Sequence, residues 1–316
     1  MPLFFILKRF TFLIMIANLG TLQEKILDLK YKRIKTGLGI GISEIDQYLR
    51  LKPADYVIAY GHSNVGKTTI LIYFFVLWAI KHEWRFLIWS SENTAESIAR
   101  RIIEFKTKQP IDKLTDDEIS DALKWCNNYF KIIDVNDMYT FKDVLEEATA
   151  IKEAWNYQGL LIDPYNSLAN DKELLKVYGK HEYDYYVSSE FRLFAKKYNI
   201  TLFLNAHGVT EALRRLEKGG EYDGLPAPLN QASIEGGGKW SNRADLCISL
   251  HRFTTHATEW MYSFIRIEKV KEIETGGRPT PHDQPIKLRM MPNNVGFEFC
   301  GRDLMGETNK VKEIEF

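Results

Sequence analysis

Residues 61–68 have the types and the spacing of a phosphate-binding loop. The segment reads GHSNVGKT and follows the short apolar run YVIAY at 56–60, which is expected to form a strand. Its glycines let backbone N–H groups approach phosphate oxygens, and the helix expected over 69–80 adds positive potential. Lys67 would neutralise the β- and γ-phosphates, and the Thr68 hydroxyl would bind Mg²⁺. The predicted binding residues for ATP and Mg²⁺ are Gly61, His62, Ser63, Asn64, Val65, Gly66, Lys67, Thr68 and Thr69.

Two carboxylates stand at the ends of other apolar runs that are expected to be strands. Glu92 follows the run RFLIW at 85–89 and precedes an expected helix at 94–105, so it is placed to polarise an attacking water. The alternative role for Glu92 is to cap that helix. Asp163 ends the run GLLID at 159–163. Downstream of a phosphate-binding loop, this pattern predicts a carboxylate that holds Mg²⁺.

A histidine closes a further expected strand. The run TLFLNA at 201–206 follows an expected helix at 181–198 and ends at His207. Ligands gather at the carboxyl ends of parallel strands, so His207 could donate a hydrogen bond to a γ-phosphate and report its hydrolysis. A purely structural role is the alternative for a single histidine.

The segment at 208–242 is long, and it carries basic residues beside the glycine triplet at 236–238. Long loops inside a compact domain are usually functional or disordered. Basic side chains on a mobile loop suit contacts with a phosphate backbone. The predicted contacts with single-stranded DNA are Arg214, Arg215, Lys239 and Arg243. The alternative is a solvated surface loop.

The remaining pattern gives the fold class. The chain is expected to be helical over most of 106–150, with a strand at 130–135, and to end in strands at 246–250 and 261–267 and a hairpin at 286–299. Alternating strands and helices predict an α/β fold with a doubly wound, mainly parallel sheet flanked by helices. This P-loop domain would span 36–316, and residues 1–35 would form a short N-terminal arm with one amphipathic helix at 22–34.

Composition excludes several classes of protein. The 316 residues are 45% hydrophobic with 42 basic and 42 acidic side chains, which argues against disorder and against a uniformly basic surface. Three cysteines without a CxxC motif argue against a disulfide scaffold, a zinc ribbon or an iron–sulfur site, and favour a reducing, cytoplasmic setting. Apolar runs at 3–7 and 10–16 are too short to span a bilayer and lack a clean cleavage site. They are expected to pack, to bind a partner, or to result from an upstream start with the natural one at Met15, and membrane attachment is the alternative.

The order of these motifs resembles a known family. GHSNVGKT, SSENTAESIARRI, LLIDPYN, FLNAH, GGGKWSNRADLCISLHR and IRIEKVK are similar, in this order, to the RecA-like motor domain of DnaB-type hexameric replicative helicases. The similarity covers about residues 36–300, and DPYN at 163–166 and His207 favour the phage primase-helicases and Twinkle-like helicases. The resemblance implies the roles given above for Lys67, Thr68, Glu92, Asp163 and His207.

The resemblance also adds residues that the pattern alone does not assign. It places Arg252 near the adenine, and it matches Lys269 and Lys271 to a K-x-R pair that a neighbouring subunit inserts into the site. Lysine stands here where the family usually has arginine, so the charge is kept but the bidentate fork is lost. The helix at 22–34 lies where relatives have a linker helix that docks on the next subunit.

The implied function is ATP-dependent translocation on single-stranded DNA and duplex unwinding during DNA replication. The implied assembly is a homo-oligomeric, hexameric ring that works with a separate primase or loader, in the host cytoplasm if the chain is encoded by a phage. Two alternatives stay open. One is a RecA- or RadA-like recombinase that forms filaments, and the other is a regulatory P-loop module that binds nucleotide without turnover.

Overall fold

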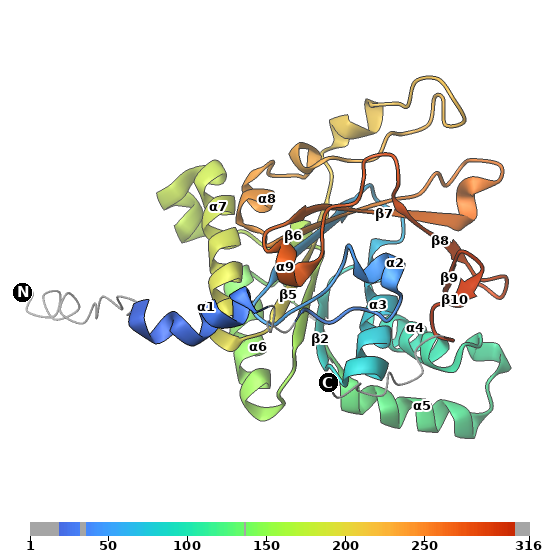
Figure 1. Cartoon of the computed structure of the whole chain (residues 1–316), viewed down its shortest axis with the longest axis horizontal. Helices are drawn as coiled ribbons and strands as arrows, with labels where there is room; N and C mark the ends of the chain where they lie inside the picture. Colours follow the sequence, from blue (N-terminus) through green and yellow to red (C-terminus); the bar gives the residue numbers. More distant parts are fainter. Residues whose placement is uncertain (1–18, 32–35, 136, 307–316) are drawn as a thin grey trace, which may run out of the picture. The chain divides into compact units, whose positions relative to one another are not determined.

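The computed structural model describes residues 19–31, 36–135 and 137–306. The chain divides into two compact units, residues 1–35 and residues 36–316. In the first unit, a 3-10 turn at Leu19–Leu22 leads into helix α1, Gln23–Lys30 (Figure 1). The helix expected at 22–34 is therefore present but shorter, and residues 32–35 lie outside the described part. The apolar runs at 3–7 and 10–16 also lie outside it.

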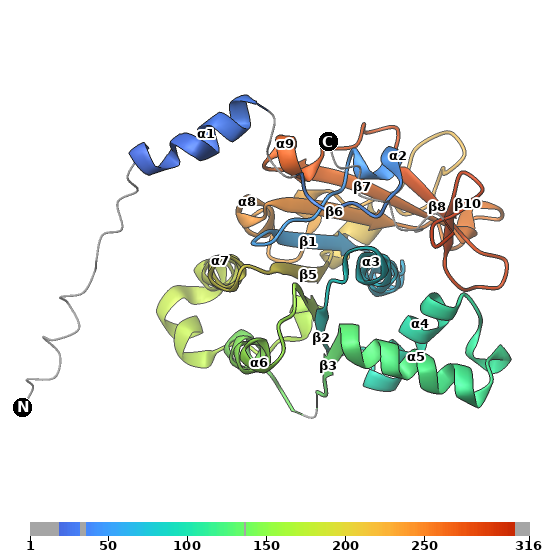
Figure 2. The ribbon, with the colours of Figure 1, turned by 60° about the horizontal axis from the view of Figure 1, so that its bottom comes forward.

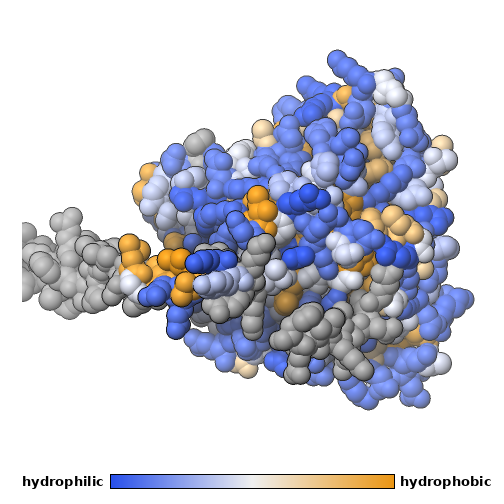
Figure 3. All heavy atoms as spheres, in the orientation of Figure 1, coloured by the Kyte–Doolittle hydropathy of each residue, from blue (hydrophilic) through white to orange (hydrophobic). Residues whose placement is uncertain are grey.

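The 3-10 turn and helix α1 carry exposed apolar side chains. Leu19 of the turn is 76% exposed, and Ile26 of the helix is 56% exposed. Figure 3 shows hydrophobic atoms on the surface of this helix. In the described residues, no helix is long and apolar enough to cross a membrane.

The second unit is built on one mixed sheet. In the described chain, its ten strands lie in the order β10-β9-β8-β7-β6-β1-β5-β4-β2-β3. The strands from β6 to β3 in this order pair in parallel, and β7 to β10 add an antiparallel edge. The strands are β1 Tyr56–Gly61, β2 Phe86–Ser90, β3 Phe130–Ile133, β4 Gly159–Asp163, β5 Thr201–His207, β6 Leu246–His251, β7 Tyr262–Val270, β8 Ile286–Met290, β9 Phe297–Phe299 and β10 Arg302–Asp303.

Helices cover both faces of this sheet (Figure 2). One face packs against α3 Lys67–His82, α4 Ala95–Thr107 and α5 Asp116–Tyr129, and the other packs against α6 Phe141–Ala154 and α7 Lys172–Tyr198. Alternation along β1 explains the two layers, because Val57 and Ala59 enter the first core while Ile58 and Tyr60 enter the second. The predicted doubly wound, mainly parallel α/β fold is confirmed.

Short helices complete the unit. They are α2 Ser43–Asp46, α8 Lys239–Arg243 and α9 Ile273–Gly276, with 3-10 turns that include Thr210–Arg214 and Gln231–Ser233. The segment at 208–242 is thus less irregular than its sequence suggests, because it contains both turns and the start of α8.

Two boundaries differ from the sequence expectations. Helix α7 begins at Lys172, well before 181, because the Asp171 carboxylate caps it by accepting from the backbone N–H groups of Glu173 and Leu174. Gly179, with φ 68° and ψ 164°, then bends it. Strand β7 continues to Val270 because it pairs with β6 up to Leu246, so Lys269 lies on a strand.

Candidate active site

The phosphate-binding loop joins β1 to α3 at the carboxyl end of the parallel strands, between β5 and β6. Its two terminal glycines are required by the geometry. A Cβ atom on Gly61 would lie 2.2 Å from the Leu250 carbonyl oxygen, and Gly66 has φ +85°. Helix α3 starts directly after Gly66 with Lys67 and Thr68, so both side chains stand at its positive end.

The Lys67 ammonium is buried beneath the loop. Its Nζ donates to the carbonyl oxygens of Gly61 at 3.2 Å and of His62 at 2.9 Å. Burial lowers the pKa of Lys67 to about 8, and the nearby carboxylates of Asp163 and Glu92 oppose that shift. A buried cation whose hydrogen-bond partners are all neutral favours an anionic ligand such as a phosphate group.

The proposed metal end of the site is rich in oxygen atoms. The Thr68 hydroxyl donates to Asp163 at 2.8 Å, and the Ser90 hydroxyl donates to the same carboxylate at 3.3 Å. Asp163 is fully buried, which raises its pKa, while hydrogen bonds from Thr68 and Asn205 lower it. The side-chain amide oxygen Oδ1 of Asn205 is buried, and it has no hydrogen-bond partner among the described residues. Hard oxygen ligands of this kind fit Mg²⁺, which Thr68 and Asp163 would hold together with phosphate oxygens.

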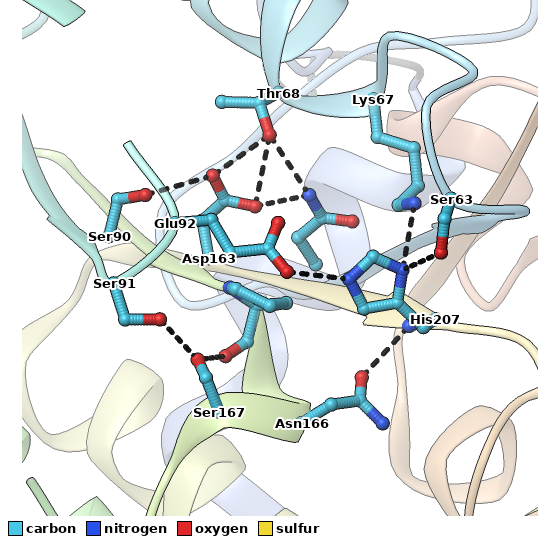
Figure 4. A network of polar contacts seen from close by, with 12 residues as sticks. Ser63, Lys67, Thr68, Ser90, Ser91, Glu92, Asp163, Asn166, Ser167 and His207 are labelled. Carbon is cyan, nitrogen blue, oxygen red and sulfur yellow. Dashed lines mark hydrogen bonds and ion pairs between the residues drawn. The ribbon is translucent and has the colours of Figure 1, made fainter. Parts of the chain in front are cut away.

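His207 connects the phosphate-binding loop to Glu92 (Figure 4). Its Nδ1 lies 3.3 Å from Lys67 Nζ, and its Nε2 lies 3.2 Å from Glu92 Oε1. An ammonium can only donate, so Nδ1 accepts from Lys67 and the proton on Nε2 points at the carboxylate. The backbone N–H of His207 donates to Asn166 at 2.9 Å, which fixes the end of β5. Glu92 is half exposed and can therefore reach water.

These groups surround one cavity of 510 Å³. It is lined by Ser63, Asn64, Gly66, Lys67, Thr68, Thr69, Glu92, Asn93, Arg101, Asn205, His207 and Arg252. The structure thus brings together most of the residues predicted for phosphate, metal and base roles. Three lining cations, Lys67, Arg101 and Arg252, exceed the single lining carboxylate of Glu92, so the cavity favours a polyanion.

Three lining residues were not predicted: Asn93, Arg101 and Asn205. Asn205 could have been found, because it lies two residues before His207 on a strand and so shares its face. Arg101 lies on α4 and reaches the cavity only because that helix packs beside it. Four residues predicted for nucleotide or metal binding do not line the cavity: Gly61, His62, Val65 and the buried Asp163. The His62 ring instead donates from Nε2 to the Ala227 carbonyl oxygen at 2.9 Å.

Arg252 lines the cavity next to Gly66 of the phosphate-binding loop. Its Nη1 would be 3.8 Å from a Cβ atom at Gly66, and its Nη2 donates to the Trp260 carbonyl oxygen at 2.6 Å. Burial lowers its pKa. This place suits the predicted contact with the nucleotide beyond its phosphates.

Lys269 and Lys271 lie at the end of the strands that is opposite to the cavity. Lys269 pairs in register with Cys247 near the start of β6, whereas the cavity lies beyond the other end of that strand. The Lys269 Nζ donates to the Ser241 carbonyl oxygen at 2.6 Å, and Lys271 forms an ion pair with Asp245 at 3.4 Å. Within one chain the structure does not bring this pair to the cavity, so only a second subunit could use it.

The four predicted DNA contacts fall into two environments. Arg214 and Arg215 are exposed, and in the described residues neither side chain forms an ion pair or hydrogen bond. Lys239 lies 3.8 Å from the Asp184 carboxylate, and the Arg243 guanidinium lies 4.2 Å from the centre of the Tyr185 ring. Lys239 and Arg243 therefore also hold α8 against α7.

Comparisons with known proteins agree with this architecture. No protein-family model matches the chain. Over 229 residues it is 25% identical to the "Twinkle homolog protein, chloroplastic/mitochondrial" of Arabidopsis thaliana, an alignment that covers 68% of this chain and 30% of that protein. The chain therefore spans under a third of that relative.

Two solved structures share the fold. One is an ATPase domain, with 15% identity and a TM-score of 0.67 over 88% of this chain and 98% of its own. The other is a DnaB-like replicative helicase studied with primase, with 14% identity and a TM-score of 0.65 over 89% of this chain and 66% of its own. The predicted resemblance is confirmed: the chain has the RecA-like fold of a DnaB-like helicase ATPase domain, and part of its sequence is similar to that of a Twinkle homologue.

Proposed function

We propose that this chain, with the fold of a DnaB-like helicase ATPase domain, hydrolyses ATP with Mg²⁺ to move along single-stranded DNA as a ring of subunits and to unwind duplexes. One observation carries the proposal. Thr68 of the phosphate-binding loop donates to the buried Asp163 carboxylate and shares one cavity with the Glu92–His207 pair, although these groups follow four different strands. A site that only stores nucleotide has no need of the last pair.

Each residue has a definite task in the proposed hydrolysis. Lys67 binds the β- and γ-phosphate oxygens. Thr68 and Asp163 would hold a Mg²⁺ ion, which would supply positive charge to neutralise the developing phosphate charge. Glu92 accepts the proton of the attacking water. His207 keeps the Glu92 carboxylate oriented through its Nε2 proton and contacts the loop through Nδ1.

His207 also begins the segment proposed to contact DNA. Its carbonyl oxygen accepts from Glu235 at 3.0 Å, and the next bond along, from Val209 to the Ser233 carbonyl oxygen, measures 2.9 Å. The two ends of this loop are therefore joined by hydrogen bonds next to His207. A movement of His207 on hydrolysis would displace both ends of the loop, and with them Arg214, Arg215 and the glycine triplet at 236–238.

A ring explains the position of the two lysines. Lys269 and Lys271 lie too far from their own cavity, and a head-to-tail arrangement of subunits would place this edge of one chain against the cavity of the next. The exposed apolar side chains of α1 would supply a further contact between subunits. A primase or loader would be a separate partner.

The test is ATP hydrolysis with Mg²⁺, measured with and without single-stranded DNA, together with imaging of the particles and unwinding of a forked duplex. DNA-stimulated turnover by closed rings that separate the fork would support the proposal. Filaments that hydrolyse ATP without unwinding would favour a recombinase. Nucleotide binding without turnover would favour a regulatory module.

A further inference from the structure

Arg101 is a basic residue of the cavity to which the proposed function gives no task. It lies on α4, is partly buried, and lines the cavity beside Glu92 and Asn93. In residues 19–31, 36–135 and 137–306, its guanidinium forms no ion pair or hydrogen bond. The adjacent Arg100 differs, because it is exposed and binds both oxygens of Glu104, at 2.9 Å and 2.8 Å.

An unpaired and partly buried guanidinium is costly for the folded protein. Burial lowers the pKa of Arg101, and the neighbouring charge of Arg100 lowers it further. Arginine nevertheless stays protonated, so the charge persists and its desolvation is uncompensated until an anion binds. The attraction that Arg101 does feel comes first from Asp163, the carboxylate beneath Thr68, and then from Glu104.

Arg101 and Arg252 differ in what surrounds their guanidinium groups. Arg252 lies against Gly66 and already donates to the Trp260 carbonyl oxygen. Arg101 instead lines the cavity that Glu92 also lines, and the carboxylate that attracts it most is Asp163, at the metal end where the terminal phosphate of a bound triphosphate would lie. A guanidinium presents paired N–H groups that match the oxygens of a phosphate group.

We propose that Arg101 binds the terminal phosphate of the nucleoside triphosphate within its own subunit, and so distinguishes triphosphate from diphosphate. The inference rests on the proposed nucleotide site, but it does not depend on DNA, unwinding or ring formation. The residues proposed to reach the site from a neighbouring subunit, Lys269 and Lys271, have no guanidinium, and Arg101 would supply one from the same chain.

The experiment compares the affinities of the full chain for ATPγS and for ADP, both with Mg²⁺, by titration calorimetry. Arg101→Ala should weaken ATPγS binding by about tenfold, the order expected for losing one charge-assisted contact, while ADP affinity stays within about twofold. Arg101→Lys should recover only part of the loss, because it restores charge without the fork. Arg100→Ala is the matched control one residue away, and it should bind both nucleotides like the wild type.

Two results would overturn the inference. One is equal loss of ATPγS and ADP affinity in Arg101→Ala, which would make the residue a structural support. The other is wild-type affinity for both nucleotides. Failure of the nucleotide site itself is recognised separately, because the unmodified chain would then bind neither nucleotide and Lys67→Ala would change nothing.

Discussion

Lys67 is the residue on which the proposed chemistry depends most directly. It is the only cation of the phosphate-binding loop, and its Nζ lies below the loop with two carbonyl oxygens and His207 as its contacts. Lys67→Ala should abolish ATP hydrolysis, because no other group of the loop can neutralise the β- and γ-phosphate oxygens. The rate of phosphate release measures this loss of hydrolysis. Lys81→Ala, at the other end of α3, is the control and should hydrolyse ATP normally. Near-normal turnover in Lys67→Ala would reject the loop as a phosphate site.

Glu92 is tested by a change that preserves its shape. Glu92→Gln should leave ATP affinity close to that of the wild type while hydrolysis falls by at least about 100-fold, since an amide cannot accept the proton of water. Binding by titration and single-turnover hydrolysis separate the two effects. Glu96→Gln, on the exposed first turn of α4, serves as the control. If binding and hydrolysis fell together, Glu92 would instead have a structural role, although not as the helix cap, because the Thr94 hydroxyl caps α4 by accepting from the backbone N–H of Ser97 at 3.3 Å.

Sequence could predict those residues of the site that follow strands, and it failed for those that reach the site through packing. Lys67, Glu92, Asp163 and His207 all stand at or just beyond carboxyl ends of parallel strands, where adjacency in the sheet is implied by the strand pattern. Arg101 lies further along a helix, and its orientation depends on how that helix rests on α3. No local pattern encodes that packing.

The start of helix α7 and the end of strand β7 differ from the boundaries that the apolar pattern predicts. A helix cap sets the first boundary, and backbone pairing between strands sets the second. The first turns of α7, KELLKVYG, mix apolar and charged residues and end at Gly179, and the capping carboxylate of Asp171 sets where the helix begins. Strand β7 runs on to Val270 because β6 offers backbone partners, although the charged residues at its end resemble a turn. Both differences arise from interactions that hydrophobic periodicity does not record.

The segment at 208–242 gives a prediction that separates its two basic pairs. Arg214 and Arg215 are exposed, so replacing both with Gln should reduce affinity for single-stranded DNA and make its salt dependence shallower. The slope of log affinity against log salt should fall by about 0.7 for each lost phosphate contact. Basal ATP hydrolysis and the unfolding temperature should stay near wild type. Fluorescence titrations over a series of salt concentrations measure the slope.

Lys239 and Arg243 form the comparison pair. Replacing both with Gln removes the ion pair with Asp184 and the contact with the Tyr185 ring, so the unfolding temperature should fall along with DNA affinity. An unchanged slope in the Arg214/Arg215 variant, with normal DNA-stimulated hydrolysis, would return this segment to a solvated surface loop.

Across the whole molecule, the sheet separates two charged regions with different tasks. The carboxyl ends of the parallel strands carry the cavity, with unpaired cations directed at a ligand. The opposite ends carry ion pairs that close on themselves, such as Arg192 with Asp245 at 2.7 Å and Lys271 with Asp245 at 3.4 Å. This second region holds the amino end of β1, so its charges act on the stability of the fold.

Asp55 links that region to the pH dependence of stability. It is 6% exposed at the start of β1, and burial raises its pKa from 3.8 to about 7, with Lys52 opposing and Asp245 adding to the shift. The folded state therefore holds this proton up to about pH 7, while the unfolded chain releases it near pH 4. Between these limits the folded state binds more protons, so the contribution of Asp55 to the free energy of unfolding falls as pH rises.

Asp55→Asn should remove this decrease in the free energy of unfolding at higher pH. The amide oxygen still accepts from the Lys52 backbone N–H, but the side chain cannot ionise. Relative to wild type, the free energy of unfolding of the variant should rise between about pH 5 and about pH 8 by up to roughly 3 kcal/mol, which is two pKa units of linkage. Urea unfolding at the two pH values measures the difference. Asp112→Asn, on a side chain that is 68% exposed, is the control and should show no such change. A difference between variant and wild type that is the same at both pH values would mean that Asp55 is ionised throughout, held by Lys52 more strongly than burial opposes it.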